Sequence, residues 1–368
     1  MTDERAVLTR LWWAGVNAVK GEQAVAASLG AAPIPAPTAI AAVGKAAAAM
    51  AQPAMERFPG TPTLVVTKYN HAPEMPGAEV IESAHPVPDA ESLRAGARLL
   101  DFVSSQPSGV HLLLLVSGGA SALVEVPTPG LTLDDLISEN SRLLAAGLDI
   151  AAMNTRRREL SQVKGGGLLG AFRGARVTVL AISDVEGDSL GVIGSGIGLV
   201  PEGVGYAHDS RIVGSNANAR EAVAKAAEAE GLAVLSSDET LYSDYKEAAD
   251  TIASGLSGQT GLRIWGGEPT VVLPPDPGEG GRNQALALAL AQKVAGRDGV
   301  TALVAGTDGS DGPTLAAGGI VDGQTWTTEG AKYLDRADAG TFLEQRDALF
   351  TTGPTGTNVM DLALVLQR

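Results

Sequence analysis

The chain has 368 residues, long enough for two domains, and its 45% content of hydrophobic residues is typical of globular proteins with buried cores. The formal net charge of −15 disfavours nucleic acid or an anionic membrane as a partner, because both attract basic surfaces. Without cysteine, disulfides and thiolate sites are excluded, and the four histidines do not have zinc-ligand spacing. Any bound metal would therefore have oxygen ligands, which favours Mg²⁺ or Mn²⁺.

The apolar runs and the first residues predict a protein without a targeting or membrane segment. The start, Met1–Arg5, is polar and unlike a signal peptide. No apolar stretch approaches the roughly 20 residues that a membrane-spanning helix needs. We therefore expect a cytoplasmic protein.

The N-terminal half alternates predicted helices with short apolar strands. Helical spacing of apolar side chains predicts a first helix from Leu8 to Val19, which a proline-rich connector follows. Strands are predicted at residues 38–43, 64–67, 80–81, 110–116 and 177–182. Helices are predicted at residues 46–50, 90–104, 133–148 and about 153–172. This alternation indicates right-handed crossovers and a mostly parallel sheet.

A glycine-rich stretch at residues 194–209 is the predicted linker, and the alternation resumes after it. Strands are predicted at residues 211–213, 233–235 and 262–265. Two further strands are predicted to end at Ala305 and near Thr352. Helices are predicted at residues 217–229, 243–254 and 283–294. The predicted fold class is therefore α/β, with mostly parallel sheets in two domains: a Rossmann-like N-terminal domain (1–205) and a smaller C-terminal domain (206–368).

Several of the predicted strands end abruptly in a glycine-rich polar loop; the last strand residues are Val116, Ile182, Trp265, Ala305 and Thr351. In α/β sheets, ligands bind outside the carboxyl ends of the strands. Glycine lets backbone N–H groups approach phosphate oxygens, and carboxylates can hold the accompanying Mg²⁺. The pattern therefore predicts phosphate chemistry.

Two strand-to-helix turns in the N-terminal half contain candidate phosphate-binding residues. Lys45 follows Gly44 at a strand-to-helix turn, where its ammonium would lie near an anion site, although a solvated surface lysine is the alternative. Ser117–Ser121 has the composition of a phosphate loop but lacks the Walker lysine. A tight strand-to-helix turn is the more common structure for such a sequence.

The charged residues offer further candidates. Arg156–Arg158 and Lys164 form the only dense basic patch, and at least one arginine is expected to point into a cleft rather than along a solvated helix face. The aspartates that follow strands can bind a cation or cap helices, and capping is expected for at least half of them: Asp184, Asp188, Asp308 and Asp311. Arg282 opens a helix, where a cation is unfavourable unless an anion is nearby.

Taken together, the motifs resemble the glycerate 2-kinase family with its MOFRL-type C-terminal region. The resemblance covers nearly the whole chain in order, and its motifs are residues 43–46, 85–89, 116–123, 154–166, 183–188, 193–196, 214–216, 266–268, 280–284, 306–313 and 352–358. The chain departs from the family pattern at several positions; Leu315 replaces an aspartate and Met360 an asparagine.

The resemblance implies an enzyme with two α/β domains and an active site in the inter-domain cleft, which uses ATP and Mg²⁺ to phosphorylate D-glycerate at its 2-hydroxyl to 2-phosphoglycerate. The family's catalytic lysine and arginine would correspond to Lys45 and Arg282. We assign the nucleotide to Ser117, Gly118, Gly119, Ala120, Ser121, Gly266, Gly267, Glu268, Asp308 and Gly309. The glycerate is assigned to Arg157, Lys164 and His85, and the metal to Asp184 or Asp188.

Three alternatives remain open at this point. The chain could be an oxidoreductase acting on hydroxypyruvate with a nicotinamide cofactor, yet Gly194-Ser195-Gly196 matches only the start of a dinucleotide fingerprint. It could be a kinase for another small hydroxy acid, or a non-catalytic relative. The sequence leaves open whether the protein is a homo-oligomer.

Overall fold

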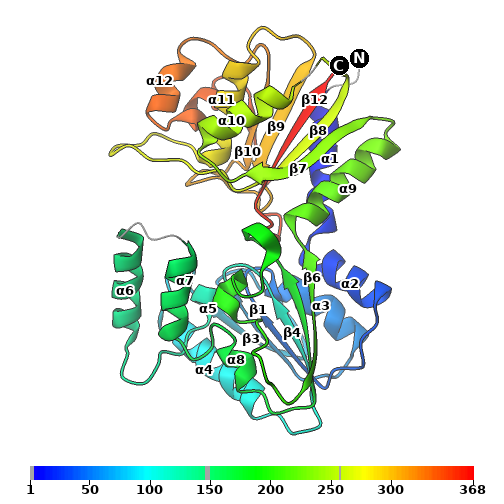
Figure 1. The fold of residues 1–368 in the computed structure, drawn as a ribbon, viewed down its shortest axis with the longest axis vertical. Coiled ribbons are helices and arrows are strands. Elements are labelled where there is room, and N and C mark those ends of the chain that lie inside the picture. The colour runs from blue at the N-terminus through cyan, green and yellow to red at the C-terminus, as the bar shows by residue number, and fades with distance from the viewer. Residues whose placement is uncertain (1–3, 146–149, 257) are drawn as a thin grey trace. The chain divides into compact units, whose positions relative to one another are not determined.

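The computed structural model describes residues 4–145, 150–256 and 258–368, which form two compact units (Figure 1). The N-terminal unit is the continuous segment Lys20–Ser215. The C-terminal unit combines the residues up to Val19 with Asn216–Arg368. The chain therefore passes from one unit to the other between Val19 and Lys20 and again between Ser215 and Asn216, rather than between residues 205 and 206.

The first helix belongs to the C-terminal unit because of its apolar face. Helix α1 (Glu4–Ala18) packs on helix α9 (Asn216–Ala229) and on two strands of the C-terminal sheet, and Figure 1 shows the blue α1 beside the green α9. Its side chains Leu8, Leu11 and Trp12 are fully buried. Each such burial stabilises the fold by roughly 1.5–3 kcal/mol.

The N-terminal unit is built on a parallel sheet of six strands: β1 (Ala39–Val43), β2 (Thr63–Lys68), β3 (Ala78–Ser83), β4 (His111–Val116), β5 (Arg176–Ile182) and β6 (Ala207–Gly214). Its helices are α2 (Gly21–Ala31), α3 (Ala47–Arg57), α4 (Ala90–Ser104), α5 (Ala120–Leu123), α6 (Leu133–Ala145), α7 (Ile150–Glu159) and α8 (Gly167–Gly170), with 3₁₀ turns η1 (Glu186–Asp188) and η2 (Ile193–Gly196).

The strand order in this sheet is β3-β2-β1-β4-β5-β6, and each neighbouring pair is parallel. This is the order of dinucleotide-binding α/β domains, so the Rossmann-like prediction is confirmed. Helices α4, α5 and α8 cover one face of the sheet, and α3 packs on the other. The four central strands β2, β1, β4 and β5 are mostly apolar because both of their faces are buried, whereas the edge strands β3 and β6 carry polar and partly exposed residues.

The C-terminal unit has a second six-stranded sheet: β7 (Val234–Leu241), β8 (Gly261–Gly267), β9 (Val300–Gly306), β10 (Gly318–Asp322), β11 (Leu349–Phe350) and β12 (Asp361–Gln367). Its remaining helices are α10 (Tyr245–Gly255), α11 (Arg282–Lys293), α12 (Gly330–Asp335) and α13 (Ala339–Glu344). Helices α10 and α11 cover one face of this sheet, whereas α1 and α9 cover the other.

The strand directions in the second sheet differ from the expectation of mostly parallel sheets. The order is β11-β10-β9-β12-β8-β7, and only β7 and β8 are parallel neighbours. The central strand β12 runs antiparallel to both β8 and β9. Two strands, β10 and β12, were not predicted. The α/β class itself is confirmed.

Two segments in the N-terminal unit also differ from their predictions. The helix expected at residues 153–172 is two short helices, α7 and α8, so Arg156–Arg158 lie in the last turn of α7 rather than near the start of a longer helix. The first part of the linker expected at residues 194–209 is packed structure: Ile197 is fully buried, Ser195 is nearly so, and the Gly166 N–H donates to the Gly196 carbonyl.

No helix within the described ranges is long and apolar enough to cross a membrane.

Candidate active site

The strand order of the N-terminal sheet reverses between β1 and β4, and in such sheets ligands bind in the crevice at the carboxyl ends of these two strands. Val43 pairs with Val116 at that end, so the loops that begin at Gly44 and Ser117 leave the sheet side by side. The fold therefore brings Lys45 next to the predicted phosphate loop.

Backbone contacts hold these two loops together. The Lys45 N–H donates to the Gly118 carbonyl at 2.9 Å, and the Ala46 N–H donates to the Ser117 hydroxyl at 3.1 Å. Gly44 has a φ of 129°, and a Cβ at this position would overlap the Ser117 backbone. Only glycine permits this approach, so the backbone of Lys45 has a fixed position.

Gly118 and Gly119 pack against three side chains predicted to belong to the site. A Cβ at Gly118 would overlap the carboxylate of Asp184, which follows strand β5. A Cβ at Gly119 would lie 3.0 Å from Cγ of Lys45 and 3.1 Å from Cδ2 of His85. Lys45, His85 and Asp184 thus all contact one glycine turn.

The electrostatics of this cluster follow from burial and from the lysine charge. Burial raises the pKa of Asp184, and the positive charge of Lys45 acts in the opposite direction. Burial also lowers the pKa of His85 to about 4, with smaller contributions from Lys45, Lys68 and His71. The imidazole is therefore neutral at neutral pH, whereas the Asp184 carboxylate favours a cation beside it.

A cavity of about 350 Å³ opens beside the same turn. Its lining includes the three residues predicted to bind the acceptor, together with residues of the glycine turn and an acid that was not predicted: His85, Arg157, Lys164, Gly119, Ser121 and Glu125. The structure thus brings the three acceptor candidates together around one space.

The three consecutive arginines have different surroundings. Arg156 is exposed and forms ion pairs with Glu139 at 2.9 Å and Glu159 at 2.8 Å. Arg158 donates from Nη2 to the Gly191 carbonyl. Arg157 alone lines the cavity, and burial lowers its pKa from the ordinary value, although a guanidinium stays protonated. The expectation that one arginine points into a cleft is met by Arg157.

Lys164 has a partner within the protein. Its ammonium is ion-paired with Glu125, and only 6% and 3% of the two side chains are exposed. Loss of either partner of a buried pair leaves the other charge uncompensated, which is strongly destabilising. The pair therefore forms a fixed part of the cavity wall, and sequence reasoning missed Glu125.

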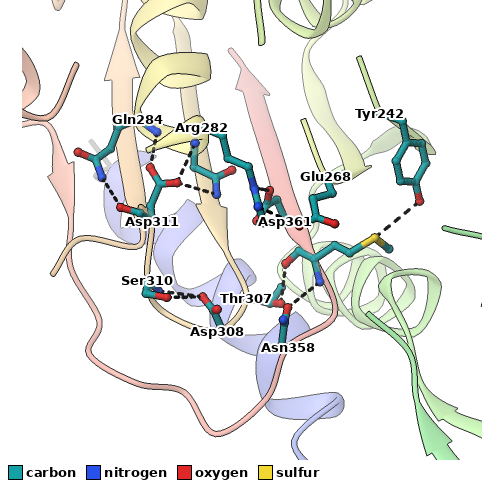
Figure 2. A network of polar contacts seen from close by, with 12 residues as sticks. Tyr242, Glu268, Arg282, Gln284, Thr307, Asp308, Ser310, Asp311, Asn358 and Asp361 are labelled. Atoms are coloured by element: carbon teal, nitrogen blue, oxygen red, sulfur yellow. Dashed lines mark hydrogen bonds and ion pairs between the residues drawn. The ribbon is translucent and has the colours of Figure 1, made fainter. Parts of the chain in front are cut away.

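A second cluster lies at the edge of the C-terminal sheet where β8 and β9 end and β12 begins (Figure 2). Arg282, the first residue of α11, donates from Nε to Oδ2 of Asp361 at 2.7 Å and from Nη2 to Oδ1 at 3.2 Å. Its Nη1 lies 2.8 Å from Oε1 of Glu268. The cation that was expected to need an anion thus has two carboxylates from its own unit.

These carboxylates dominate the electrostatics of Arg282. Burial alone would lower its pKa, but Asp361 and Glu268 raise the value above the ordinary one. The side chain of Asp361 is 2% exposed, whereas that of Glu268 is 47% exposed. The position of Arg282 at a helix start is therefore explained without an external ligand, and its catalytic role stays a prediction.

Asp311 provides the cap of helix α11. Its carboxylate accepts hydrogen bonds from the backbone N–H groups of Asn283 at 3.0 Å and Gln284 at 2.8 Å (Figure 2). Asn283 is therefore one of the residues whose backbone is capped. Burial raises the pKa of Asp311 to about 6, although the two backbone hydrogen bonds oppose the shift.

The loop after β9 is tied to the loop before β12. The Thr307 hydroxyl donates to the Met360 carbonyl at 2.6 Å, and Met360 has a φ of 67°, a conformation that asparagine adopts more easily than methionine. Asp308 accepts hydrogen bonds from the backbone and hydroxyl of Ser310 at 2.9 and 3.0 Å (Figure 2). Of the predicted nucleotide residues in this unit, Gly266 and Gly267 end β8 and Glu268 follows it, whereas Asp308 and Gly309 lie in the loop after β9. Both strands flank β12.

The described residues contain no group of three or more acidic or histidine side chains arranged to hold a metal ion. Mg²⁺ bound together with substrate phosphates needs only one or two carboxylates, however. Asp184 offers a partly buried carboxylate at the sheet edge, and Asp188 follows on the same loop in η1. This donor set fits a Mg²⁺ ion held mainly by nucleotide phosphates.

Comparison with known proteins gives consistent results. A family described as "Domain of unknown function (DUF4147)" matches residues 7–256, and the MOFRL family matches residues 261–361. A D-glycerate 2-kinase from Thermotoga maritima is 36% identical over 89% of this chain and 90% of its own. A relative from Agrobacterium vitis, provisionally named hydroxypyruvate reductase, is 32% identical over 88% of this chain and 97% of its own.

The crystal structure of a glycerate kinase from Thermotoga maritima aligns with this chain at a TM-score of 0.90 and 33% identity, and the alignment covers 99% of both chains. The two family matches together span both units and follow the order of the motifs in the sequence. The chain belongs to the glycerate kinase family, in which a DUF4147 region precedes a MOFRL region.

Proposed function

We propose that the protein is an ATP- and Mg²⁺-dependent kinase that phosphorylates D-glycerate at its 2-hydroxyl to give 2-phosphoglycerate, and that it acts in the cytoplasm. The observation that carries this proposal is the cluster at the reversal point of the parallel sheet. There Lys45, Asp184 and the Gly118-Gly119 turn lie in contact, next to a cavity with an arginine in its wall.

Phosphoryl transfer requires positioning and charge stabilisation more than covalent chemistry from the protein. The 2-hydroxyl oxygen attacks the γ-phosphorus, the bond to the bridging oxygen breaks, ADP leaves, and the hydroxyl proton is released. In this proposal the backbone N–H groups of Ser117–Ser121 bind nucleotide phosphates, and Lys45 neutralises charge that develops on the transferred group. Mg²⁺, held by Asp184 or Asp188, would supply further charge neutralisation.

The acceptor is assigned to the cavity beside Gly119. Glycerate carries a carboxylate and two hydroxyls, and the planar fork of Arg157 suits bidentate recognition of a carboxylate. The neutral imidazole of His85 can exchange hydrogen bonds with a hydroxyl without adding charge. Lys164, already paired with Glu125, contributes to the wall and to the local field.

Arg282 is proposed to act on the same phosphoryl group as Lys45. Its support is the correspondence with the family's catalytic arginine and its place among the glycine-rich loops of the C-terminal sheet. A single donor to developing charge typically contributes about 3–4 kcal/mol to barrier lowering.

Reduction of hydroxypyruvate is the alternative that the strand order of the N-terminal sheet and the names of two relatives suggest. A nicotinamide dinucleotide site would place a glycine fingerprint after β1 and an acid at the end of β2. The chain has Gly44-Lys45-Ala46 after β1, and β2 ends in Lys68. These residues support a nucleotide triphosphate over a dinucleotide.

The test is steady-state release of ADP with D-glycerate and other small hydroxy acids, with ³¹P NMR to identify which hydroxyl is phosphorylated. Calorimetric titration with ATP and with NADH is the matched binding measurement. The proposal expects turnover of D-glycerate and heat from ATP. Tight binding of NADH without any response to ATP would reject it.

A further inference from the structure

The two carboxylates on Arg282 differ in a way that suggests different roles. Asp361 is almost completely buried and takes two hydrogen bonds from one side of the guanidinium, through Nε and Nη2. Glu268 takes the remaining side through Nη1, and about half of its side chain is exposed (Figure 2). The guanidinium is thus held from the inside and covered from the outside.

The backbone position of Asp361 explains why its carboxylate cannot move away from Arg282. It is the first residue of β12, a central strand whose residue pairs lock it between Gly267 of β8 and Gly306 of β9. The preceding residue, Met360, is fixed by hydrogen bonds to Thr307. Withdrawal of the Asp361 carboxylate would leave a buried charge without its partner, which is expensive.

Glu268 is not locked between two neighbouring strands in this way. It follows the last residue of β8, and the loop that begins there continues to the start of α11 at Arg282. A long side chain with about half of its surface in solvent can rotate away and be hydrated, and exposed ion pairs are typically worth only 0.2–1 kcal/mol.

A phosphate group would be a stronger partner for the same nitrogen. Charge-assisted hydrogen bonds from arginine to phosphate are strong, and Nη1 is the donor group on the side away from Asp361, which takes Nε and Nη2. The incoming anion would replace one carboxylate by a group of higher charge without disturbing the buried contact.

We propose that Glu268 is a displaceable partner that covers the guanidinium of Arg282 until a phosphate-bearing anion takes its place, whereas Asp361 is a positioning residue that holds the guanidinium permanently. This inference rests on the proposed function in one respect, the assignment of the anion to the transferred phosphate of ATP. Glu268 then competes with the nucleotide rather than binding it.

The decisive variant is Glu268→Gln, which removes the competing charge and keeps the size of the side chain. We expect it to bind pyrophosphate about two- to fivefold more tightly than the wild-type protein, the factor that corresponds to an exposed ion pair. Glu344→Gln is the matched control, because it removes one carboxylate from an exposed position at the end of α13 in the same unit. Isothermal titration at constant ionic strength measures all three proteins.

Asp361→Asn tests the positioning role. We expect kcat with ATP and D-glycerate to fall by about tenfold or more while the KM for D-glycerate stays within about twofold, since an interaction realised in the transition state is lost. Melting temperature and circular dichroism show whether the variant is folded. If it is not, Arg282→Lys serves instead, because lysine keeps the charge but cannot reproduce the two-point contact.

Unchanged pyrophosphate affinity in Glu268→Gln, or weaker affinity than in Glu344→Gln, would overturn the displaceable role, since Glu268 would then be neutral or a true ligand contact. An unchanged kcat in Asp361→Asn would overturn the positioning role. The pyrophosphate titration does not need turnover. If it shows tighter binding while the wild-type protein fails to phosphorylate D-glycerate, the proposed function fails and this inference stands.

Discussion

The two candidate catalytic cations are fixed by opposite means. Lys45 is positioned through its backbone, because Gly44 and Gly118 let two loops approach closely and bond to one another. Arg282 is positioned through its side chain, because Asp361 and Glu268 hold its guanidinium. Close glycine packing therefore fixes the backbone of Lys45, whereas ion pairing fixes the charged group of Arg282 itself. The two sites should therefore respond differently to mutation.

The largest expected effect separates catalysis from stability at the two cations. Lys45→Ala and Arg282→Ala should each lower kcat by about 10²–10³-fold, as for lost donors to transition-state charge. Only Arg282→Ala should also destabilise the fold, by about 1–3 kcal/mol, because Asp361 remains buried without its partner. ADP release and urea denaturation measure the two effects.

The double variant sharpens this prediction. If both cations act on one phosphoryl group, Lys45→Ala/Arg282→Ala should lose less activity than the sum of the single losses, because residues that act as a unit are non-additive. Strict additivity of the two losses would contradict a shared role.

The second prediction tests the close packing of the loops at Gly44. Gly44→Ala should destabilise the protein by about 2–3 kcal/mol, because the new Cβ overlaps the Ser117 backbone and the φ of 129° is strained for alanine. Gly60→Ala is the control: its φ is 77°, yet nothing lies within 4 Å of the added Cβ. Gly60→Ala should lower the free energy of unfolding by about 1 kcal/mol, because only the positive φ is unfavourable for alanine there. Equal losses of unfolding free energy in the two variants would show that the close approach is unimportant.

The third prediction concerns the pH dependence of the C-terminal unit. Because the pKa of Asp311 is about 6 in the folded state and near 3.8 when unfolded, the folded state binds the proton more tightly, and stability is lost as pH rises from about 4 to about 6. Asp311→Asn removes this titration. The stability of the wild-type protein relative to Asp311→Asn should therefore fall by about 1–3 kcal/mol across that window.

Urea denaturation at pH 4 and pH 6.5 measures this difference. Asp298→Asn, at an exposed position, is the control and should show no comparable change. A constant difference between wild-type protein and Asp311→Asn at the two pH values would show that the buried carboxylate does not titrate as expected.

The smallest predicted effect distinguishes neighbouring arginines. Arg157→Ala should raise the KM for D-glycerate about tenfold with little change in the KM for ATP, the signature of lost uniform binding to the acceptor. Arg156→Ala should change neither, since Arg156 forms exposed ion pairs with Glu139 and Glu159. If the KM for D-glycerate is unchanged in both variants, Arg157 does not bind the acceptor and has only a structural role in the cavity wall.

The sequence predicted those features that local patterns encode. Helix α4 was expected at residues 90–104 and runs from Ala90 to Ser104, because Asp89 and Ser92 form a capping box at its start. The parallel N-terminal sheet followed from alternating strands and helices. Its reversal point then brought Lys45 and Ser117–Ser121 together by a general rule of α/β sheets.

Features that depend on distant partners were not predicted. Asp361 and Arg282 are 79 positions apart, and Glu125 and Lys164 are 39 apart, so no local pattern connects them. An apolar run also does not indicate whether a strand is parallel or antiparallel to its neighbours. We expected polar site residues at the carboxyl ends of strands, whereas Asp361 lies at the amino end of an antiparallel strand. The sequence predicted that one arginine of the basic patch points into a cleft. That this is Arg157 could not be predicted, because it depends on where α7 ends.

The division of the C-terminal unit between the two ends of the chain sets an order of events during synthesis. The N-terminal unit is one continuous segment and can fold as soon as Ser215 has left the ribosome. Helix α1 emerges before the N-terminal unit, whereas its partner strands β9 and β12 are translated roughly 14–70 s later at ordinary rates. Until these strands have been made, the apolar face with Leu8, Leu11 and Trp12 lacks two of its partners on the nascent chain, and a chaperone that binds short apolar helices could bind it there.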